Sequence, residues 1–355
     1  MTRFALALGA AALVAAILAS TFRSPPEWIA PLNAELSQID AKFEGDVGVY
    51  VKRLQDGGEV DFGSDRSWYL ASTVKVLVAA ALLNEVERGS LSLDEKIQLK
   101  TSDFIDGSGE VMRKKPGSRL RIGYLLEQML EQSDSTATDL LIRRVGLERI
   151  NSFVANQSPG FGPITSILDV RYQAYAEAHP NAKILTNLDF IRLKRVPSSR
   201  RLQAFARRIR VPVRDLKVKT LNEAFELYYQ KGMNSAPLKC YGGFLERLLA
   251  GGMLSPHSTR LLTSHMERAI TGERRIKAGL PKGFRFAQKT GTQEARVCNV
   301  GMIRPPNGDD RVIIAACLQK FTSFRKAEAT LRDVGRALIR AGVFQSWKPT
   351  GSRGD

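Results

Sequence analysis

Strand patterns occur at both ends of this chain and helical patterns fill its middle, and this distribution constrains the fold more than any other feature. Residues 46–54 alternate apolar and polar side chains up to a turn signal at Gln55–Gly58, and residues 59–62 resume the strand pattern. Three more strands are predicted near the C-terminus, at 284–290, 297–303 and 311–319. The sequence therefore predicts an α+β domain in which the two ends of the chain build one sheet.

The segments between these strands are predicted to be helical. Residues 72–88 contain no Gly or Pro, are rich in Ala, Leu and Val, and stop at Gly89, which predicts a buried helix. Further helices are predicted at 120–132, 137–145 and 326–343. An apolar fraction of 43% beside 25% charged residues gives the 355-residue chain enough material for a sizeable core and rules out global disorder.

The N-terminus predicts export to the periplasm or cell envelope. After Arg3, sixteen apolar or small residues run from Phe4 to Ala19, the layout of a secretory signal. The segment is shorter than the roughly 20 residues that span a bilayer. We interpret residues 1–22 as a signal peptide or an uncleaved N-terminal anchor, 30–345 as the folded domain, and 346–355 as a tail.

Basic residues exceed acidic ones by 17, which favours anionic partners. Most of the excess lies in one segment, Arg192–Lys219, which holds eleven basic residues and one acid. This segment falls in a predicted basic insertion at about 160–217. Because the protein is expected outside the cytoplasm and shows no reading module, we expect an anionic envelope polymer as its partner and no nucleic acid.

Metal and cofactor chemistry is not predicted. Three cysteines (Cys240, Cys298, Cys317) and three histidines are too few and too scattered for a zinc cluster or a disulfide framework. One disulfide with a free thiol and three reduced thiols fit the sequence equally well, and the oligomeric state stays open.

The first of three short motifs is Ser72-Thr73-Val74-Lys75, at the start of the predicted buried helix. Residues i and i+3 share a helix face, so the Lys75 ammonium can reach the Ser72 hydroxyl. Burial disfavours the charged ammonium, which makes Lys75 a usable base for activating a serine. The same pattern recurs at Ser323-Phe324-Arg325-Lys326, which we interpret as a solvated helix start.

Two further motifs make the interpretation of the first one more specific. Ser133-Asp134-Ser135 lies between two predicted helices, and Lys289-Thr290-Gly291-Thr292 lies at the end of the first C-terminal strand. Alone, they predict a helix N-cap and a strand running into a turn. In this order, the three motifs resemble those of the serine β-lactamase and penicillin-binding-protein superfamily, closest to class A β-lactamase-like serine hydrolases.

The resemblance covers roughly residues 35–345 and implies a β-lactamase-like fold. In that fold an antiparallel sheet built from both chain ends is flanked by helices and accompanied by an all-helical subdomain. The catalytic residues it implies are Ser72 as nucleophile, Lys75 as its base, Ser133 as proton relay, and Lys289. The implied substrate-binding residues are Ser135, Thr290, Gly291, Thr292 and Asn222, with the backbone N–H groups of Ser72 and Thr292 as the oxyanion hole.

One departure from the class A pattern bears on turnover. That class uses a glutamate in a Glu-x-x-Leu-Asn loop to activate the deacylating water, and the best match here, residues 218–224, has Val218 in place of the glutamate. A valine cannot activate water, and losing a general base costs about 10² to 10⁴ in rate. Glu177 and Glu223 are the candidate substitutes.

These observations predict an exported serine acyl-transfer hydrolase of the class A β-lactamase type. It would hydrolyse β-lactams through a Ser72 acyl-enzyme, with weak deacylation. A penicillin-binding-protein-like D-alanyl-D-alanine peptidase is an alternative, because peptidoglycan peptides also carry a free carboxylate. A catalytically idle envelope-binding module that uses the basic insertion is the second alternative.

Overall fold

The computed structural model describes residues 24–306 and 309–347. The predicted signal peptide or anchor at 1–22, and most of the predicted tail, lie outside these residues. Within the described part of the chain, no helix has both the length and the apolar character needed to cross a bilayer.

The two chain ends form one antiparallel five-stranded sheet, as predicted. Its order is β2-β1-β9-β8-β7. The strands are β1 (Asp46–Arg53), β2 (Glu59–Phe62), β7 (Arg285–Gln293), β8 (Arg296–Arg304) and β9 (Val312–Gln319). The structure differs from the expectation at β7, which continues to Gln293, so the Lys289–Thr292 motif lies inside the strand. Its pairing with β8 in register explains the extra length.

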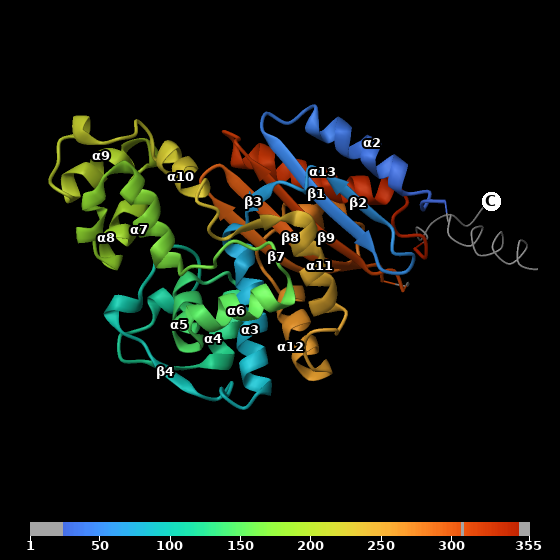
Figure 1. Ribbon diagram of the computed structural model, residues 1–355, viewed down its shortest axis with the longest axis horizontal. Coiled ribbons are helices and arrows are strands. Elements are labelled where there is room, and N and C mark those ends of the chain that lie inside the picture. Colours follow the sequence, from blue (N-terminus) through green and yellow to red (C-terminus); the bar gives the residue numbers. More distant parts are fainter. Residues whose placement is uncertain (1–23, 307–308, 348–355) are drawn as a thin grey trace, which may run out of the picture.

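Each face of the sheet is covered by helices (Figure 1). The side chains of β1 alternate, so Val49 and Val51 pack beneath α2 (Ile29–Asp40) and α13 (Phe324–Arg340). Tyr50 packs on the opposite face with α11 (Leu238–Leu249) and α12 (Pro256–Glu267). Ser323 accepts a hydrogen bond from the Lys326 N–H and begins α13, which confirms the interpretation of this second motif match as a helix start.

The central element of the helical part is α3 (Lys75–Glu87), preceded by the 3₁₀ turn η1 (Ala71–Val74). Residues 75–83 are all buried, so this helix is apolar on every side and is surrounded by others. It ends where Gly89 adopts a left-handed φ of 74°. The helices that surround it include α4 (Ile122–Glu131), α5 (Ser135–Val145) and α6 (Leu147–Gln157).

A second group of helices projects beyond this core at the left of Figure 1. We call it the basic lobe. It consists of α7 (Ile167–Ala178), α8 (Asn187–Arg195), α9 (Ser198–Arg208) and α10 (Leu221–Tyr229). Its own apolar cluster includes Tyr175, Phe190 and Phe205. Two small sheets complete the fold: β3 (Ser67–Tyr69) pairs with β6 (Ser235–Pro237), and β4 (Lys96–Gln98) with β5 (Arg119–Arg121).

Candidate active site

A cleft of about 580 Å³ lies where the edge strand β7 meets the helical part. Side chains from all three sequence motifs line it: Ser72, Ser133, Ser135, Thr290 and Thr292. These residues are far apart in the sequence, and the fold brings them to one place.

Ser72 lies in the η1 turn, directly before the buried helix α3. Ala71 beside it has a φ of 48°, a left-handed conformation that costs a non-glycine residue about 1–3 kcal/mol. A hydrogen bond fixes the turn to α11: the buried Tyr241 hydroxyl donates to the Thr73 carbonyl at 2.6 Å. The surrounding structure therefore holds the strained Ala71, and with it the neighbouring Ser72, in position at the cleft.

The Ser133 hydroxyl lies between two lysine side chains. Lys289 Nζ is 2.8 Å from Ser133 Oγ and Lys75 Nζ is 3.2 Å from it. Lys75 Nζ also donates to the Ser133 carbonyl at 2.5 Å. Within the described residues, the ammonium of Lys75 thus bonds to Ser133 rather than directly to Ser72. Ser133 has a left-handed φ of 58°, so it too is held in a strained conformation.

Both lysines are completely buried, and burial disfavours their charged forms. It lowers the pKa of Lys75 to about 7, against the opposing attraction of Asp134 and Asp139. The pKa of Lys289 is also lowered, by burial first and then by repulsion from Lys75 and Arg275. Lys75 is therefore poised to give up a proton near neutral pH.

The middle residue of the second motif is structural. Asp134 caps α5, where one carboxylate oxygen accepts the Ala137 N–H at 2.8 Å. The other accepts the Val111 N–H, also at 2.8 Å, and so ties down the loop that covers the motif. This confirms that Ser133-Asp134-Ser135 acts as an N-capping segment as well as lining the cleft.

Strand β7 approaches the Ser72 turn very closely at Gly291. A Cβ on Gly291 would lie 2.5 Å from the Leu70 carbonyl oxygen and 3.2 Å from the Ser72 nitrogen. Only glycine allows this approach, which brings the backbone of the strand beside the backbone of the nucleophile.

Arg275 and Thr271 join the third motif, although sequence reasoning did not find them. The Arg275 guanidinium donates to the Gly291 carbonyl at 2.9 Å and to Thr292 Oγ1 at 2.7 Å. The Thr290 and Thr271 hydroxyls are 2.8 Å apart. Lys289 and Arg275 thus bring two buried cationic side chains to this part of the site, and Glu328, 3.3 Å from Arg275, brings one carboxylate.

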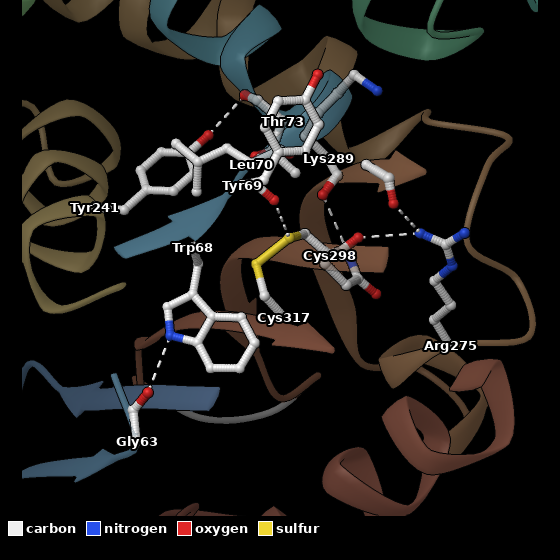
Figure 2. Close-up of a disulfide and its surroundings, with 12 residues drawn as sticks. Gly63, Trp68, Tyr69, Leu70, Thr73, Tyr241, Arg275, Lys289, Cys298 and Cys317 are labelled. Atoms are coloured by element: carbon white, nitrogen blue, oxygen red, sulfur yellow. Dashed lines mark hydrogen bonds between the residues drawn. A yellow bond between two sulfur atoms is a disulfide. The ribbon is translucent and has the colours of Figure 1, made fainter. Parts of the chain in front are cut away.

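A disulfide joins Cys298 on β8 to Cys317 on β9 (Figure 2). The remaining thiol, on Cys240, is free. The bond joins residues that face each other across β8 and β9. The Cys298 sulfur is 3.5 Å from the Tyr69 carbonyl, and Arg275 donates to the Cys298 carbonyl at 3.0 Å. Cys298 thus contacts both the segment leading to Ser72 and Arg275.

The wall formed by α7 is apolar near its start, where Ile167 and Val170 line the cleft. The buried Asp139 carboxylate fixes this segment by accepting the N–H groups of Ile167 at 2.7 Å and Leu168 at 2.9 Å. Burial raises the pKa of Asp139 to about 6. One turn along, Arg171 also lines the cleft and is ion-paired with Asp106 at 2.8 Å.

The match of residues 218–224 to the water-activating loop is wrong. Val218 is buried in the apolar cluster of the basic lobe, and Asn222 is exposed on the first turn of α10. Neither residue lines the cleft. The reason is that the first helix of the basic lobe, α7, forms the cleft wall through Ile167 and Val170. The segment 218–224 comes at the end of the lobe and does not reach the cleft.

The two glutamates predicted as substitutes also lie elsewhere. Glu223 is exposed and accepts the Lys219 N–H at 2.8 Å, which stabilises the start of α10. Glu177 is ion-paired with Lys231 at 2.5 Å. The carboxylates that do line the cleft are Glu294 and Glu328. In the described residues, no group of three His, Cys, Asp or Glu side chains is arranged to hold a metal ion.

Sequence comparisons show the family to which this chain is similar. A sequence profile described as the beta-lactamase enzyme family matches residues 31–341. A "Beta-lactamase" from Proteus vulgaris is 23% identical over 325 residues, which cover 90% of each chain. A "Beta-lactamase" from Mycobacterium tuberculosis is 23% identical over 294 residues, 81% of this chain and 79% of that one.

Solved structures share the fold. A point mutant of PBP-A, determined as an acyl-enzyme complex with penicillin G, has a TM-score of 0.67 at 21% identity and covers 90% of this chain and 98% of its own. An ancestral class A β-lactamase has a TM-score of 0.66 at 21% identity, covering 87% and 99%. With the family profile matching most of its length, this chain belongs to the beta-lactamase enzyme family.

Proposed function

We propose that this protein is a serine hydrolase that opens β-lactams through an acyl-enzyme on Ser72 and releases the product slowly. The observation that carries the proposal is the pair of buried lysines, Lys75 and Lys289, on either side of Ser133 Oγ beside Ser72. The arrangement supplies a nucleophile, a base and a path for the proton.

Acylation follows from these positions. Neutral Lys75 accepts the proton of Ser72 as Oγ attacks the β-lactam carbonyl, and collapse of the tetrahedral intermediate breaks the C–N bond. The proton returns through Ser133 Oγ to the leaving nitrogen. Lowering the pKa of Lys75 to about 7 supports this role, because much of the amine is then neutral at physiological pH.

The oxyanion of the intermediate would be held by the backbone N–H groups of Ser72 and Thr292. The close approach of Gly291 to the Ser72 turn supports this assignment, because it brings the two backbones together. Each donor of this kind is worth about 3 kcal/mol of barrier.

The free carboxylate of the substrate would bind at the end of the cleft where Thr290 lies, next to the oxyanion position at Thr292. Lys289 and Arg275 bring positive charge close to Thr290. Arg275 is also paired with Glu328, and the Thr290 hydroxyl supplies a hydrogen bond. A β-lactam and a peptidoglycan peptide both carry such a carboxylate, so this end accepts either class of substrate.

Slow deacylation follows from the apolar wall. Ile167 and Val170 cannot activate a water molecule. The cleft carboxylates are ion-paired, Glu294 with Arg201 and Glu328 with Arg275, each at 3.3 Å. Both carboxylates are thus engaged by arginine side chains, which leaves them less free to bind and orient a water molecule.

A D-alanyl-D-alanine peptidase is the second candidate, and the same apolar wall favours it. Without a group dedicated to water activation, an acyl-enzyme could be released by attack of an amine or by slow hydrolysis.

A catalytically idle binding module is the third candidate. This candidate does not explain why two lysine side chains, Lys75 and Lys289, are completely buried beside Ser133, since burying such groups is costly.

One experiment separates these candidates: incubation with a chromogenic cephalosporin, followed by intact-mass measurement. Continuous colour release indicates a β-lactamase with rapid turnover. One equivalent of colour with a stable adduct on Ser72 indicates slow deacylation, and cleavage of a D-alanyl-D-alanine peptide would then identify the peptidase. Absence of both colour and adduct, with no change in the Ser72→Ala variant, would contradict acyl transfer altogether.

We also propose that the protein is exported to the periplasm or cell envelope, with or without removal of residues 1–22. The Cys298–Cys317 disulfide supports this, because disulfides persist mainly in oxidising compartments. Mass spectrometry of the mature protein from envelope fractions would identify the N-terminal residue.

The basic surface of the lobe is the proposed docking site for an anionic envelope polymer. Of the eleven cations in Arg192–Lys219, all but Arg201 are exposed. Binding to wall fractions should weaken steeply as salt rises. A variant with Arg200, Arg207 and Arg210 changed to Gln should bind less while acylation of Ser72 is preserved. Equal retention of this variant and the wild type would contradict the proposal.

A further inference from the structure

Lys194 connects the basic lobe to the active-site cleft. It lies in the last turn of α8 and lines the cleft together with Arg171, Gln293 and Glu294. The same four residues line an adjoining hollow. The lysine is thus part of the cleft wall, although it belongs to the lobe.

Arg201 holds the end of α8 in this position. Its buried guanidinium donates to the Leu193 carbonyl at 3.1 Å and contacts Glu294 Oε1 at 3.3 Å. Glu294 belongs to the turn between β7 and β8, where its carbonyl accepts the Tyr229 hydroxyl at 2.9 Å. The lobe is therefore tied to the end of β7, and Lys194 is held beside the strand that carries the third motif.

Lys194 differs from the two arginines near it, because it has no carboxylate partner. Arg171 is ion-paired with Asp106, and Arg201 is ion-paired with Glu294. Within the described residues, Lys194 has no carboxylate within 4.0 Å and forms no salt bridge. Its side chain is exposed overall, but desolvation by the surrounding cleft wall lowers its pKa first, followed by repulsion from Arg171, with Arg201 adding to the repulsion and Glu294 and Asp106 opposing it.

The direction of β7 indicates which part of a substrate reaches Lys194. In the proposed function, the substrate carboxylate lies near Thr290 and the reacting carbonyl near Thr292. Gln293 and Glu294 follow on the far side of Thr292, so the acyl part of the substrate extends toward them and toward Lys194.

We propose that Lys194, with Arg171 beside it, forms a subsite for a second carboxylate carried by the acyl part of the substrate. This inference rests on the proposed acyl-enzyme function and names the substrate class that the site prefers. The carboxylate could belong to the side chain of a β-lactam or to an acidic residue of a wall peptide. Both present the same group to Lys194.

The test compares acylation rate constants for two pairs of substrates. Carbenicillin and benzylpenicillin differ only by a carboxylate on the acyl side chain. Glutarylglycyl and pentanoylglycyl thioglycolate form the peptide-like pair. The measured quantity is the ratio of second-order acylation constants within each pair. These constants are obtained by fitting adduct formation and adduct decay together in intact-mass time courses.

Lys194→Ala should lower the ratio by about three- to ten-fold in at least one pair, and less at high salt. A lower ratio in the penicillin pair would show that the subsite binds the side chain of a β-lactam, and a lower ratio in the thioester pair would show that it binds a peptide-like acyl group. The matched control is Arg195→Ala, which removes an equal exposed charge that does not line the cleft and should leave both ratios within about two-fold.

Unchanged ratios in both pairs for Lys194→Ala, with benzylpenicillin still acylating Ser72, would overturn the subsite and leave the proposed function intact. An equal drop in Arg195→Ala would also overturn it, because the effect would then come from the general charge of the lobe. Failure of the wild-type protein to be acylated by any of the four compounds would contradict the proposed function itself.

Discussion

At the scale of single residues, the chemistry depends on two ammonium groups that share one hydroxyl oxygen. Lys75 and Lys289 are both buried, and each is within hydrogen-bond distance of Ser133 Oγ. Two positive charges this close cannot both be stable away from water. When Lys75 becomes neutral, its repulsion of Lys289 is relieved, although burial still lowers the Lys289 pKa. In the proposed mechanism Lys75 serves as the base and Lys289 faces the substrate carboxylate.

Acylation should therefore depend on pH with a midpoint near the Lys75 pKa of about 7. The active base is the neutral amine, and its fraction falls roughly ten-fold per pH unit below the pKa. We expect the acylation constant with benzylpenicillin to fall from pH 8 to pH 5.5 and to level off above pH 8. A constant that does not vary over this range would contradict the role of Lys75.

Ile167→Glu should shorten the life of the acyl-enzyme. This change places a carboxylate in the apolar wall at the start of α7, where it can activate water. We expect the deacylation constant to rise by at least about ten-fold, within the range of general-base catalysis. The measurement is the decay of the Ser72 adduct followed by intact mass.

The control for Ile167→Glu is Leu168→Glu, one residue further along the same turn and not part of the cleft wall. It adds the same charge to the same helix. An equal acceleration in both variants would show that the effect does not come from the wall beside Ser72.

The motif residues could be predicted because their chemistry requires particular side chains at short spacings. Arg275 could not, since it lies in a loop with other basic residues and its role depends on contacts with Gly291 and Thr292. The assignments of Asn222 and Glu223 failed for a related reason. A local likeness to Glu-x-x-Leu-Asn carries no information about which segment the fold places beside Ser72.

At the scale of elements, the site depends on how closely β7 approaches the η1 turn. Gly291→Ala would force a Cβ to within 2.5 Å of the Leu70 carbonyl and push the strand away from Ser72. We expect acylation to fall by about 10² or more, as when an oxyanion donor is lost. The measurement is the acylation constant, with circular dichroism to check the fold.

Gly243→Ala is the matched control for this variant. Gly243 lies inside α11, and a Cβ there meets no atom within 4 Å. The exchange should raise stability by about 0.5–1 kcal/mol and leave acylation unchanged. A loss of acylation in this variant equal to that in Gly291→Ala would mean that the close approach of β7 is not the cause.

Element types were largely predictable from the sequence, and element ends were less so. Alternation and turn residues located β1, β2, β8 and β9 within a residue or two, because one face of each strand must meet an apolar layer. The end of β7 was missed since Thr290 to Gln293 lack strong alternation and extend only through pairing with β8.

At the scale of the whole molecule, the sheet formed by the two chain ends contains one cross-strand disulfide, which joins the neighbouring strands β8 and β9 beneath the active site. Removing it with Cys298→Ala and Cys317→Ala should lower the free energy of unfolding by about 2–4 kcal/mol. The measurement is urea unfolding of the oxidised wild type and the double variant.

Cys240→Ser is the control, because this thiol is free and only partly buried. It should change the free energy of unfolding by no more than about 0.5 kcal/mol. A double variant as stable as the wild type would contradict a stabilising role for the disulfide.

The basic lobe changes how the net charge of the chain is understood. Arg192–Lys219 contains eleven basic residues and one acid, so most of the net charge of +17 belongs to this segment. The sequence could locate this excess but not its relation to the cleft. That relation depends on Arg201 and Glu294, which join the lobe to β7 and bring Lys194 to the wall.

The most direct test of the acyl-transfer proposal is the intact mass of the protein after incubation with benzylpenicillin. We predict one added penicilloyl group per molecule, located on Ser72 by peptide mapping, absent in Ser72→Ala and persisting after the free drug is removed. A folded wild-type protein that gains no mass and hydrolyses no β-lactam would contradict the account, as would an adduct that forms equally in Ser72→Ala.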